Sequence, residues 1–177
     1  MVISDTDKRY MRVSLNLAEE ALKAGDVPIG TCLTIEGLLI GSERNKQSAN
    51  NNWFNHAENS LIKRFASEIK TARKQNKSVE VYTTVEPCLM CLGTMVHNRI
   101  TRIVYSCPDP IAGSTHIMPP TKWYAKKWPK IESGPYAEES CRLMLEGCKK
   151  DAPNWKAGIQ EYEKLYLSIR KTIHTMP

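Results

Sequence analysis

Apolar runs of two different periodicities alternate through the middle of this chain, and this alternation limits the folds open to it. Residues 57–74 and 88–98 carry apolar side chains at helical spacing, whereas 79–84 and 102–105 are short runs typical of strands. Strands separated by helices form a parallel or mixed sheet that the helices cover. The alternation therefore predicts an α/β sandwich rather than an all-α or all-β fold.

A β-hairpin is expected on the N-terminal side of this region. The apolar runs 29–35 and 38–40 are joined by Glu36-Gly37, a dipeptide suited to a tight turn between antiparallel strands. They follow a segment, 5–24, whose apolar residues recur at helical spacing, and Gly25 stands where a left-handed helix cap is expected. The chain is therefore expected to begin with a helix and two antiparallel strands.

The segments around the central elements are polar or rich in proline. Residues 42–55 lack apolar periodicity, so we expect a loop there that lies over a functional site. Prolines recur between residues 106 and 135 and exclude a long helix, which leaves 130–132 as the best fifth strand. Helical spacing returns over 137–150 and 154–172.

The composition is that of one compact domain. The chain has 177 residues, of which 41% are hydrophobic and 25% charged, close to globular averages. We expect a single core over residues 1–153, with 154–177 as a helical extension packed on the same domain. No stretch reaches the roughly 18 apolar residues of a membrane helix, and the first ten residues are too charged for a signal peptide. These features predict a cytoplasmic protein without a membrane partner.

The charge balance favours an anionic partner. A formal net charge of +6 suits nucleic acid, nucleotides or an acidic membrane surface alike. Lys122–Tyr124, Lys126–Trp128 and Lys130 interleave cations with aromatic rings, a pattern that suits phosphates and stacked bases. A solvated basic loop with packed tryptophans explains the same pattern, so both interpretations stay open.

Four residues form the decisive motif of the chain. His56-Ala57-Glu58 opens one expected helix, and Cys88 and Cys91 open another directly after Pro87. Cysteines three positions apart on a first helical turn face the same way, and a helix N-terminus favours their anionic form. The spacing therefore predicts that both thiolates and the imidazole bind one soft metal ion.

Zinc is the ion that this set of ligands prefers. It binds sulfur and imidazole in a tetrahedral arrangement, and three protein ligands leave the fourth position open for water, as in catalytic sites. Zinc lowers the pKa of such a water, so that hydroxide can attack a ring carbon that bears an amino group. Glu58 is not needed as a ligand, and we predict that it moves protons from the water to the ring and the departing amine.

Cysteines and histidines at such positions also have roles that need no catalytic metal. Cys88 and Cys91 could be a redox pair or two buried thiols, and His56 a helix-cap histidine. A structural zinc site would need a fourth ligand, for which His97 or Cys107 could be proposed. A non-catalytic, zinc-stabilised nucleic-acid-binding module is a further alternative, although such a module has no use for a proton shuttle.

The motif resembles that of the cytidine-deaminase-like superfamily of zinc-dependent nucleobase deaminases. Within it, Gly25–Gly30 and Val81–Thr84 are similar to the branch of tRNA adenosine deaminases, guanine deaminases and yeast-type cytosine deaminases. The resemblance implies a three-layer α/β/α sandwich with a mixed five-stranded sheet, one Zn²⁺ per chain and a homodimer. It also implies that His56, Cys88 and Cys91 are zinc ligands, Glu58 the proton shuttle and Asn45 a contact to the base. For Asn45, an ordinary turn residue is the alternative.

The resemblance also implies a substrate. Met95–Ile100, Ala112–Ser114 and Ile131–Leu143 are most similar to tRNA adenosine deaminases, which implies conversion of adenosine to inosine in tRNA or another single-stranded nucleic acid. Two features depart from that pattern: Trp53–Asn55 precedes the histidine, and a helix extends past Pro153. The helix past Pro153 resembles tails that cover the pocket in free-base deaminases. A free base, nucleoside or nucleotide, such as cytosine, guanine or a dCMP-like compound, is therefore the rival substrate.

Overall fold

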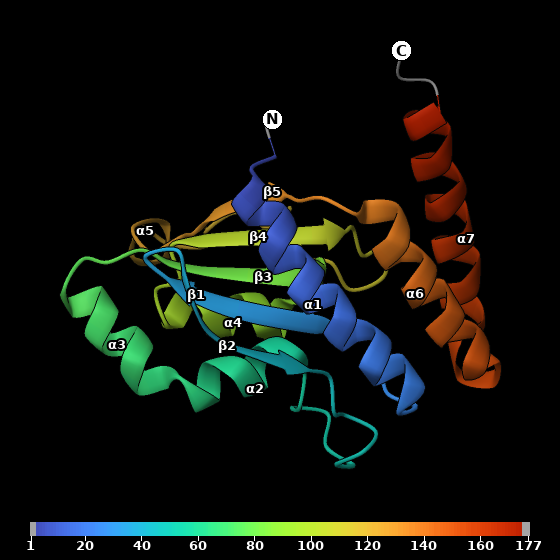
Figure 1. Cartoon of the computed structure of the whole chain (residues 1–177), viewed down its shortest axis with the longest axis horizontal. Helices are drawn as coiled ribbons and strands as arrows, with labels where there is room; N and C mark the ends of the chain where they lie inside the picture. Colours follow the sequence, from blue (N-terminus) through green and yellow to red (C-terminus); the bar gives the residue numbers. More distant parts are fainter. Residues whose placement is uncertain (1–2, 175–177) are drawn as a thin grey trace.

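The computed structural model describes residues 3–174, which fold around one mixed five-stranded sheet (Figure 1). The strand order is β2-β1-β3-β4-β5, in which β1 pairs antiparallel with β2 and β3, whereas β3, β4 and β5 run parallel. The strands are β1 (Gly30–Ile35), β2 (Leu38–Arg44), β3 (Val79–Val85), β4 (Arg102–Cys107) and β5 (Lys130–Ser133). The predicted mixed five-stranded sheet, including the short fifth strand, is confirmed.

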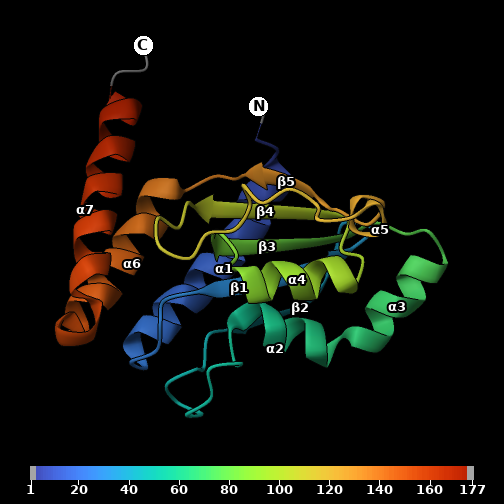
Figure 2. The same cartoon turned by 180° about the vertical axis from the view of Figure 1, so that it is seen from behind.

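Helices cover both faces of the sheet (Figures 1 and 2). One face carries α1 (Asp5–Lys23) and α6 (Ala137–Lys150), with α7 (Ala152–His174) packed along α6. The other face carries α2 (Ala57–Arg64), α3 (Ala66–Lys74) and α4 (Leu89–His97), while α5 (Lys122–Ala125) lies beyond the start of β5. Within residues 3–174, no helix combines the length and the apolar character needed to cross a membrane.

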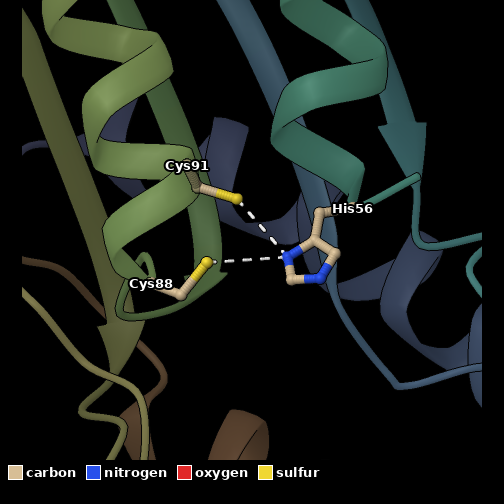
Figure 3. A group of neighbouring side chains, drawn as sticks. All are labelled: His56, Cys88 and Cys91. Atoms are coloured by element: carbon tan, nitrogen blue, oxygen red, sulfur yellow. Dashed lines mark hydrogen bonds between the residues drawn. The ribbon is translucent and has the colours of Figure 1, made fainter. Parts of the chain in front are cut away.

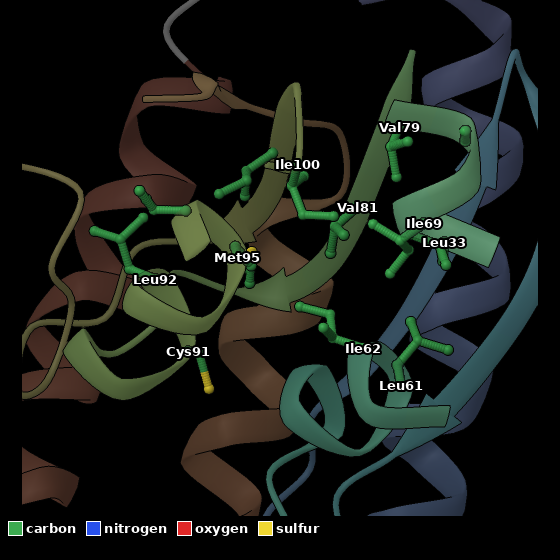
Figure 4. Packing of buried hydrophobic residues seen from close by; sticks show 13 residues of the cluster. Leu33, Leu61, Ile62, Ile69, Val79, Val81, Cys91, Leu92, Met95 and Ile100 are labelled. Atoms are coloured by element: carbon green, nitrogen blue, oxygen red, sulfur yellow. The ribbon is translucent and has the colours of Figure 1, made fainter. Parts of the chain in front are cut away.

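The alternation of side chains along the strands divides the core into two layers. Leu33 and Val81 are paired across β1 and β3 and face the α2–α4 layer, where they join a large apolar cluster (Figure 4). Their neighbours Cys32 and Tyr82 face α1 on the opposite side. Both faces of the central strands are therefore buried, and the few polar residues of β1 and β3 are mostly buried threonines.

Two boundaries differ from the sequence prediction. The loop expected from residue 42 begins only after Arg44, because the polar residues 42–44 continue the ladder of β2 with β1. β2 is an edge strand with one neighbour, so it tolerates polar side chains that a central strand would not. The single helix expected over 57–74 is in fact α2 and α3.

The break between α2 and α3 lies at Phe65. Its backbone is not helical (φ −111°, ψ 22°), and its ring occupies the space in which a side chain at Gly41 of β2 would lie. Phe65 is therefore non-helical, and its side chain packs on β2 at Gly41. The short α5 was also not predicted, since four residues are too few for a periodicity to be recognised.

The C-terminal helix packs on the main core. Tyr162 of α7 is fully buried in a cluster with Val85, Cys107, Cys141 and Met144. Close to its start, α7 is interrupted by one non-helical residue, Trp155. The division at residue 153 between a domain and an extension stays a prediction, while the packing itself joins α7 to β3, β4 and α6.

Arg102, at the start of β4, links α1, β3 and β5 through hydrogen bonds to three carboxylates. Arg102 donates to Asp7 of α1 at 2.7 Å, to Glu132 of β5 at 2.6 Å and to Glu80 of β3 at 3.2 Å. Burial would raise the pKa of Asp7, but its hydrogen bonds with Arg102 and Ser4 outweigh this effect and lower it. The hydrogen bond from Arg102 likewise lowers the pKa of Glu132.

Replacing Arg102 with methionine is expected to destabilise the fold by about 3–5 kcal/mol, because it leaves buried carboxylates without a partner. The free energy of unfolding in urea at pH 7 measures the loss. Since the paired carboxyls have lowered pKa values, their contribution is complete above about pH 4.5 and is lost as the pH falls through the folded-state values. The difference in the free energy of unfolding between the native protein and Arg102→Met should therefore become smaller at acidic pH.

The matched control is Arg142→Met, which removes an exposed pair with Glu146. That variant should lose about 0–1 kcal/mol. Equal losses in the two variants would contradict the assignment of Arg102 as a buried charge centre.

Candidate metal centre

Two helix starts bring the three predicted ligands together. His56 is the N-cap of α2, Cys88 is the N-cap of α4, and Cys91 lies in the first turn of α4. The Nδ1 atom of His56 lies 3.7 Å from Sγ of Cys88 and 3.5 Å from Sγ of Cys91. The three ligand atoms all lie within 4.8 Å of one another. Figure 3 shows the three side chains pointing toward one another. One ion could therefore contact all three.

The electrostatics of this group favour a thiolate. A hydrogen bond from Cys91, together with His56, overcomes the desolvation of Cys88 and lowers its pKa to about 4. The hydrogen bond with Cys88 raises the pKa of His56 in turn, although burial opposes it. A thiolate beside an imidazole at a helix N-terminus is a donor set for a soft cation.

The residues fit zinc in a site with an open position. Within residues 3–174, the group contains two sulfur ligands and one nitrogen ligand and no fourth His, Cys, Asp or Glu. The two residues considered as a fourth ligand lie elsewhere: Nε2 of His97 is 3.1 Å from the hydroxyl of Tyr124, and Cys107 is buried in the cluster beneath α6. The arrangement is therefore that of a catalytic rather than a closed structural site.

Glu58 lies beside the candidate ligands. Its side chain is buried, its Oε1 accepts a 2.7 Å hydrogen bond from Thr83, and its Oε2 accepts one from Cys91 at 3.4 Å. Burial raises the pKa of the carboxyl even though Thr83 partly offsets the effect. A buried carboxyl with one oxygen held in place is suited to taking up and releasing a proton.

A cavity of about 200 Å³ adjoins this group. Its walls come from four parts of the chain: the segments before and after the hairpin, the two helix starts, the loop after β4, and α6 with α7. The lining residues are Val27, Ile29, Asn45, Gln47, His56, Glu58, Glu86, Cys88, Cys91, Asp109, Ile111, Ala112, Met144, Trp155 and Tyr162. Most of the wall is apolar, with a few polar groups among the apolar side chains, as in small-molecule sites.

Asn45 lies at the cavity and is a turn residue there. Its Oδ1 accepts a hydrogen bond from the backbone of Gln47 at 2.9 Å, which is the geometry of a turn residue. Its Nδ2 is buried and has no hydrogen-bond partner within the described residues. Since Asn45 lines the cavity, that N–H group is available to a bound molecule, and its contact with a base stays a prediction.

The sequence suggested that the C-terminal helix could cover the pocket, but not which of its residues line the cavity. The hydroxyl of Tyr162 is buried and, within residues 3–174, has no hydrogen-bond partner, and burial together with nearby Asp109 raises its pKa. No local signal marked it, because a tyrosine on an amphipathic helix is ordinarily a core residue. Its place depends on how α7 packs.

Glu86 fixes the loop after β4. Its carboxylate accepts hydrogen bonds from the backbone of Asp109 at 3.1 Å and from the backbone and hydroxyl of Thr115 at 2.9 and 2.6 Å. A Cβ atom at Gly113 would lie 2.5 Å from this carboxylate, so only glycine fits there. The position of Glu86 directly before Pro87-Cys88 could have suggested a role, although no recognised motif includes it.

Comparison with known proteins identifies relatives of this arrangement. The family model of the cytidine and deoxycytidylate deaminase zinc-binding region matches residues 4–107. The tRNA-specific adenosine deaminase of Aquifex aeolicus is 32% identical over 146 residues, which cover 80% of this chain and 93% of that protein. The corresponding enzyme of Buchnera aphidicola (subsp. Baizongia pistaciae) is 34% identical over 57% of this chain, and the match spans 61% of its length.

Solved structures agree on the fold. A structure from a study of A-to-I editing by tRNA:A34 deaminases superposes with a TM-score of 0.61 at 26% identity, covering 77% of this chain and 99% of that chain. Guanine deaminase from Nitrosomonas europaea superposes with a TM-score of 0.60 at 18% identity, covering 83% and 86%. The second likeness concerns the fold alone.

Replacing Cys91 with alanine is expected to weaken zinc binding more than the roughly 10- to 100-fold that outer-shell changes cost, because it removes a direct ligand. Metal content after dialysis, measured by mass spectrometry, and a competition titration with a chelator give the loss. Cys148→Ala removes another buried, free cysteine and serves as the control. Equal zinc content in the two variants would show that Cys91 is not a ligand.

Proposed function

Because the chain belongs to the cytidine and deoxycytidylate deaminase zinc-binding family, we propose that it removes the exocyclic amino group of a nucleobase by hydrolysis and releases ammonia. The observation that carries this proposal is the buried Glu58, which contacts Cys91 at the edge of a cavity of about 200 Å³. That volume is below the roughly 300–1,000 Å³ of pockets for drug-sized ligands and suits a single flat base.

His56, Cys88 and Cys91 would hold the zinc ion. When bound, zinc lowers the pKa of a water molecule and so supplies the nucleophile at neutral pH. Glu58 would accept one proton from the water at Oε2 and pass it to the ring nitrogen, and would then carry a second proton from the hydroxyl group added to the ring carbon to the departing amine. The hydrogen bond from Thr83 holds Oε1, so the carboxyl stays oriented while the other oxygen gains and loses the proton. The apolar walls would exclude bulk water during these transfers.

Glu58→Gln is expected to lower turnover by roughly 10²- to 10⁴-fold while zinc remains bound, because the amide keeps the shape but cannot shuttle a proton. Ammonia release and zinc content are measured on the same sample. Glu20→Gln removes a carboxylate from an exposed position on α1 and should change neither. Full activity in Glu58→Gln would rule out the assigned shuttle, and a zinc-loaded native protein without any turnover would favour a binding module.

Adenosine in tRNA is the substrate that we propose first. The support comes from relatives named as tRNA-specific adenosine deaminases, one of which is matched over 93% of its length. In such a reaction the base leaves its stack and enters a pocket that holds one nucleobase. Asn45, with its unpartnered amide N–H in the cavity, is suited to hydrogen bonding with an acceptor on that base.

A free base, nucleoside or nucleotide is the second candidate, and one observation favours it. Trp155 and Tyr162 of α7 form part of the cavity wall, so the C-terminal helix narrows the approach to the metal centre. The unpartnered hydroxyl of Tyr162 gives this wall a polar contact for a small molecule. A cytosine-, guanine- or dCMP-like compound would then be bound between α7 and the ligands.

Incubation of the zinc-loaded protein with tRNA and with free bases, nucleosides and nucleotides distinguishes the two candidates. We expect inosine to form in tRNA, with the small molecules turned over at least tenfold less efficiently. Ammonia released efficiently from a small molecule would instead establish the second candidate. Tyr162→Phe should then raise KM for that compound several-fold without loss of stability, because it removes only a buried hydroxyl that has no partner.

A homodimer and a cytoplasmic location remain predictions. An exposed apolar group beside the metal centre supports the first: Trp53 and Phe54 precede α2, and Leu89 and Met90 begin α4. Since α2 and α4 pack on each other, one partner surface could cover these side chains.

A further inference from the structure

A positively charged region lies at the end of α4, whereas the metal centre lies at the start of that helix. Two neighbouring hollows of about 400 and 340 Å³ open among α3, the end of α4 and the segment after α5, and they share Arg73 and Arg99. Their lining includes no Asp or Glu. We call this region the basic surface and define it by its six cations: Lys70, Arg73, Lys74, Arg99, Lys126 and Lys127.

These cations are not balanced by carboxylates of the chain. None of the six forms an ion pair within residues 3–174, whereas Lys130 close by pairs with Glu132 at 2.9 Å. The Nε of Arg73 is buried without a hydrogen-bond partner among the described residues. Desolvation, and repulsion from Arg99, lower the pKa of Lys127. Bringing like charges together is costly, so an anion between them would be bound favourably.

Helix ends explain only part of the basic surface. Arg73 and Lys74 lie in the last turn of α3, and Arg99 follows α4, where cations interact favourably with the helix dipole. Lys126 and Lys127 follow α5, but this helix has only four residues and gives little dipole, and Lys70 lies within α3 rather than at its end. These residues lie in distant segments of the sequence, and only the fold, in which α3 packs against β3, brings them to the same two hollows.

Aromatic side chains lie beside the hollows. The ring centroids of His97 and Trp123 lie 5.5 Å apart, and Lys127 Nζ lies 2.7 Å from the centroid of the Trp123 ring. Trp123 is 49% exposed, so one part of the indole is free for stacking. Phosphate-binding cations next to exposed rings are the features with which proteins bind single-stranded nucleic acid.

The distance to the metal centre decides what kind of ligand fits. Cys88 and His97 are nine residues apart, so α4 separates the two regions by on the order of 14 Å at a rise of 1.5 Å per residue. The phosphate of a nucleotide in the cavity cannot span that distance. A polynucleotide can, with the phosphates on the basic surface about four nucleotides from the reacting base at 3.4 Å per nucleotide.

We propose that the basic surface binds the phosphate backbone of an RNA strand whose adenosine occupies the cavity at the other end of α4. This inference rests on the proposed action on RNA and adds to it a binding surface remote from the metal centre. RNA is favoured over a membrane because the cations line concave hollows, which suit individual phosphates. A membrane-binding face would instead present apolar side chains for insertion.

The double variant Lys70→Glu/Lys126→Glu tests the surface, since it changes one exposed lysine at each hollow. Lys8→Glu/Lys23→Glu on α1, on the other face of the sheet, changes the net charge equally and is the control. A fluorescently labelled RNA stem-loop with a loop adenosine is the probe. We expect at least tenfold weaker binding for the first variant, a slope of log K against log salt reduced by about two, and a less than twofold change for the control.

The outcomes separate this inference from the proposed function. If the protein deaminates no RNA but Lys70→Glu/Lys126→Glu still weakens RNA binding selectively, the surface is supported and the assigned substrate is wrong. Equal weakening in both double variants would overturn the surface, since only overall charge would matter. Binding to phosphatidylserine vesicles, lost in the first variant while RNA does not bind, would overturn it in favour of a membrane.

Discussion

The site depends on the packing of α2 and α4 side by side on one face of the sheet. Each helix begins next to the other, so His56 at one start and Cys88 and Cys91 at the other meet without any long loop to position them. The backbone N–H groups of a helix start favour thiolates there. The apolar cluster under both helices is therefore what holds the ligand atoms close enough to share one ion.

Much of this arrangement could be predicted from the sequence because it depends on local patterns. The helical and strand periodicities located the central elements to within a few residues, and the spacing of His56, Glu58, Cys88 and Cys91 indicated one metal centre before any contact was known. Such motifs are readable because each half lies on a single helical turn. The short fifth strand at 130–132 was the weakest of the strand predictions from the residues, and the family resemblance supported it by implying a five-stranded sheet.

The remaining features depend on contacts between distant segments. Phe65 interrupts a sequence with continuous helical spacing because its ring packs at Gly41, and no pattern around residue 65 records that contact. Tyr162 and Trp155 line the cavity only because α7 packs against α6. The basic surface likewise joins α3 to the segment after α5, so its charge density was not apparent in the isolated segment 122–130.

The cluster around Arg102 also bears on the order in which the chain can fold. It joins Asp7 in the first helix to Glu132 in the last strand, and the hydrogen bond to Asp7 alone closes a separation of 95 residues. Contacts of such long range form slowly, because the intervening chain must be ordered first. During synthesis, α1 emerges from the ribosome well before β5, so its buried carboxylate cannot reach its full set of partners until most of the protein has been made.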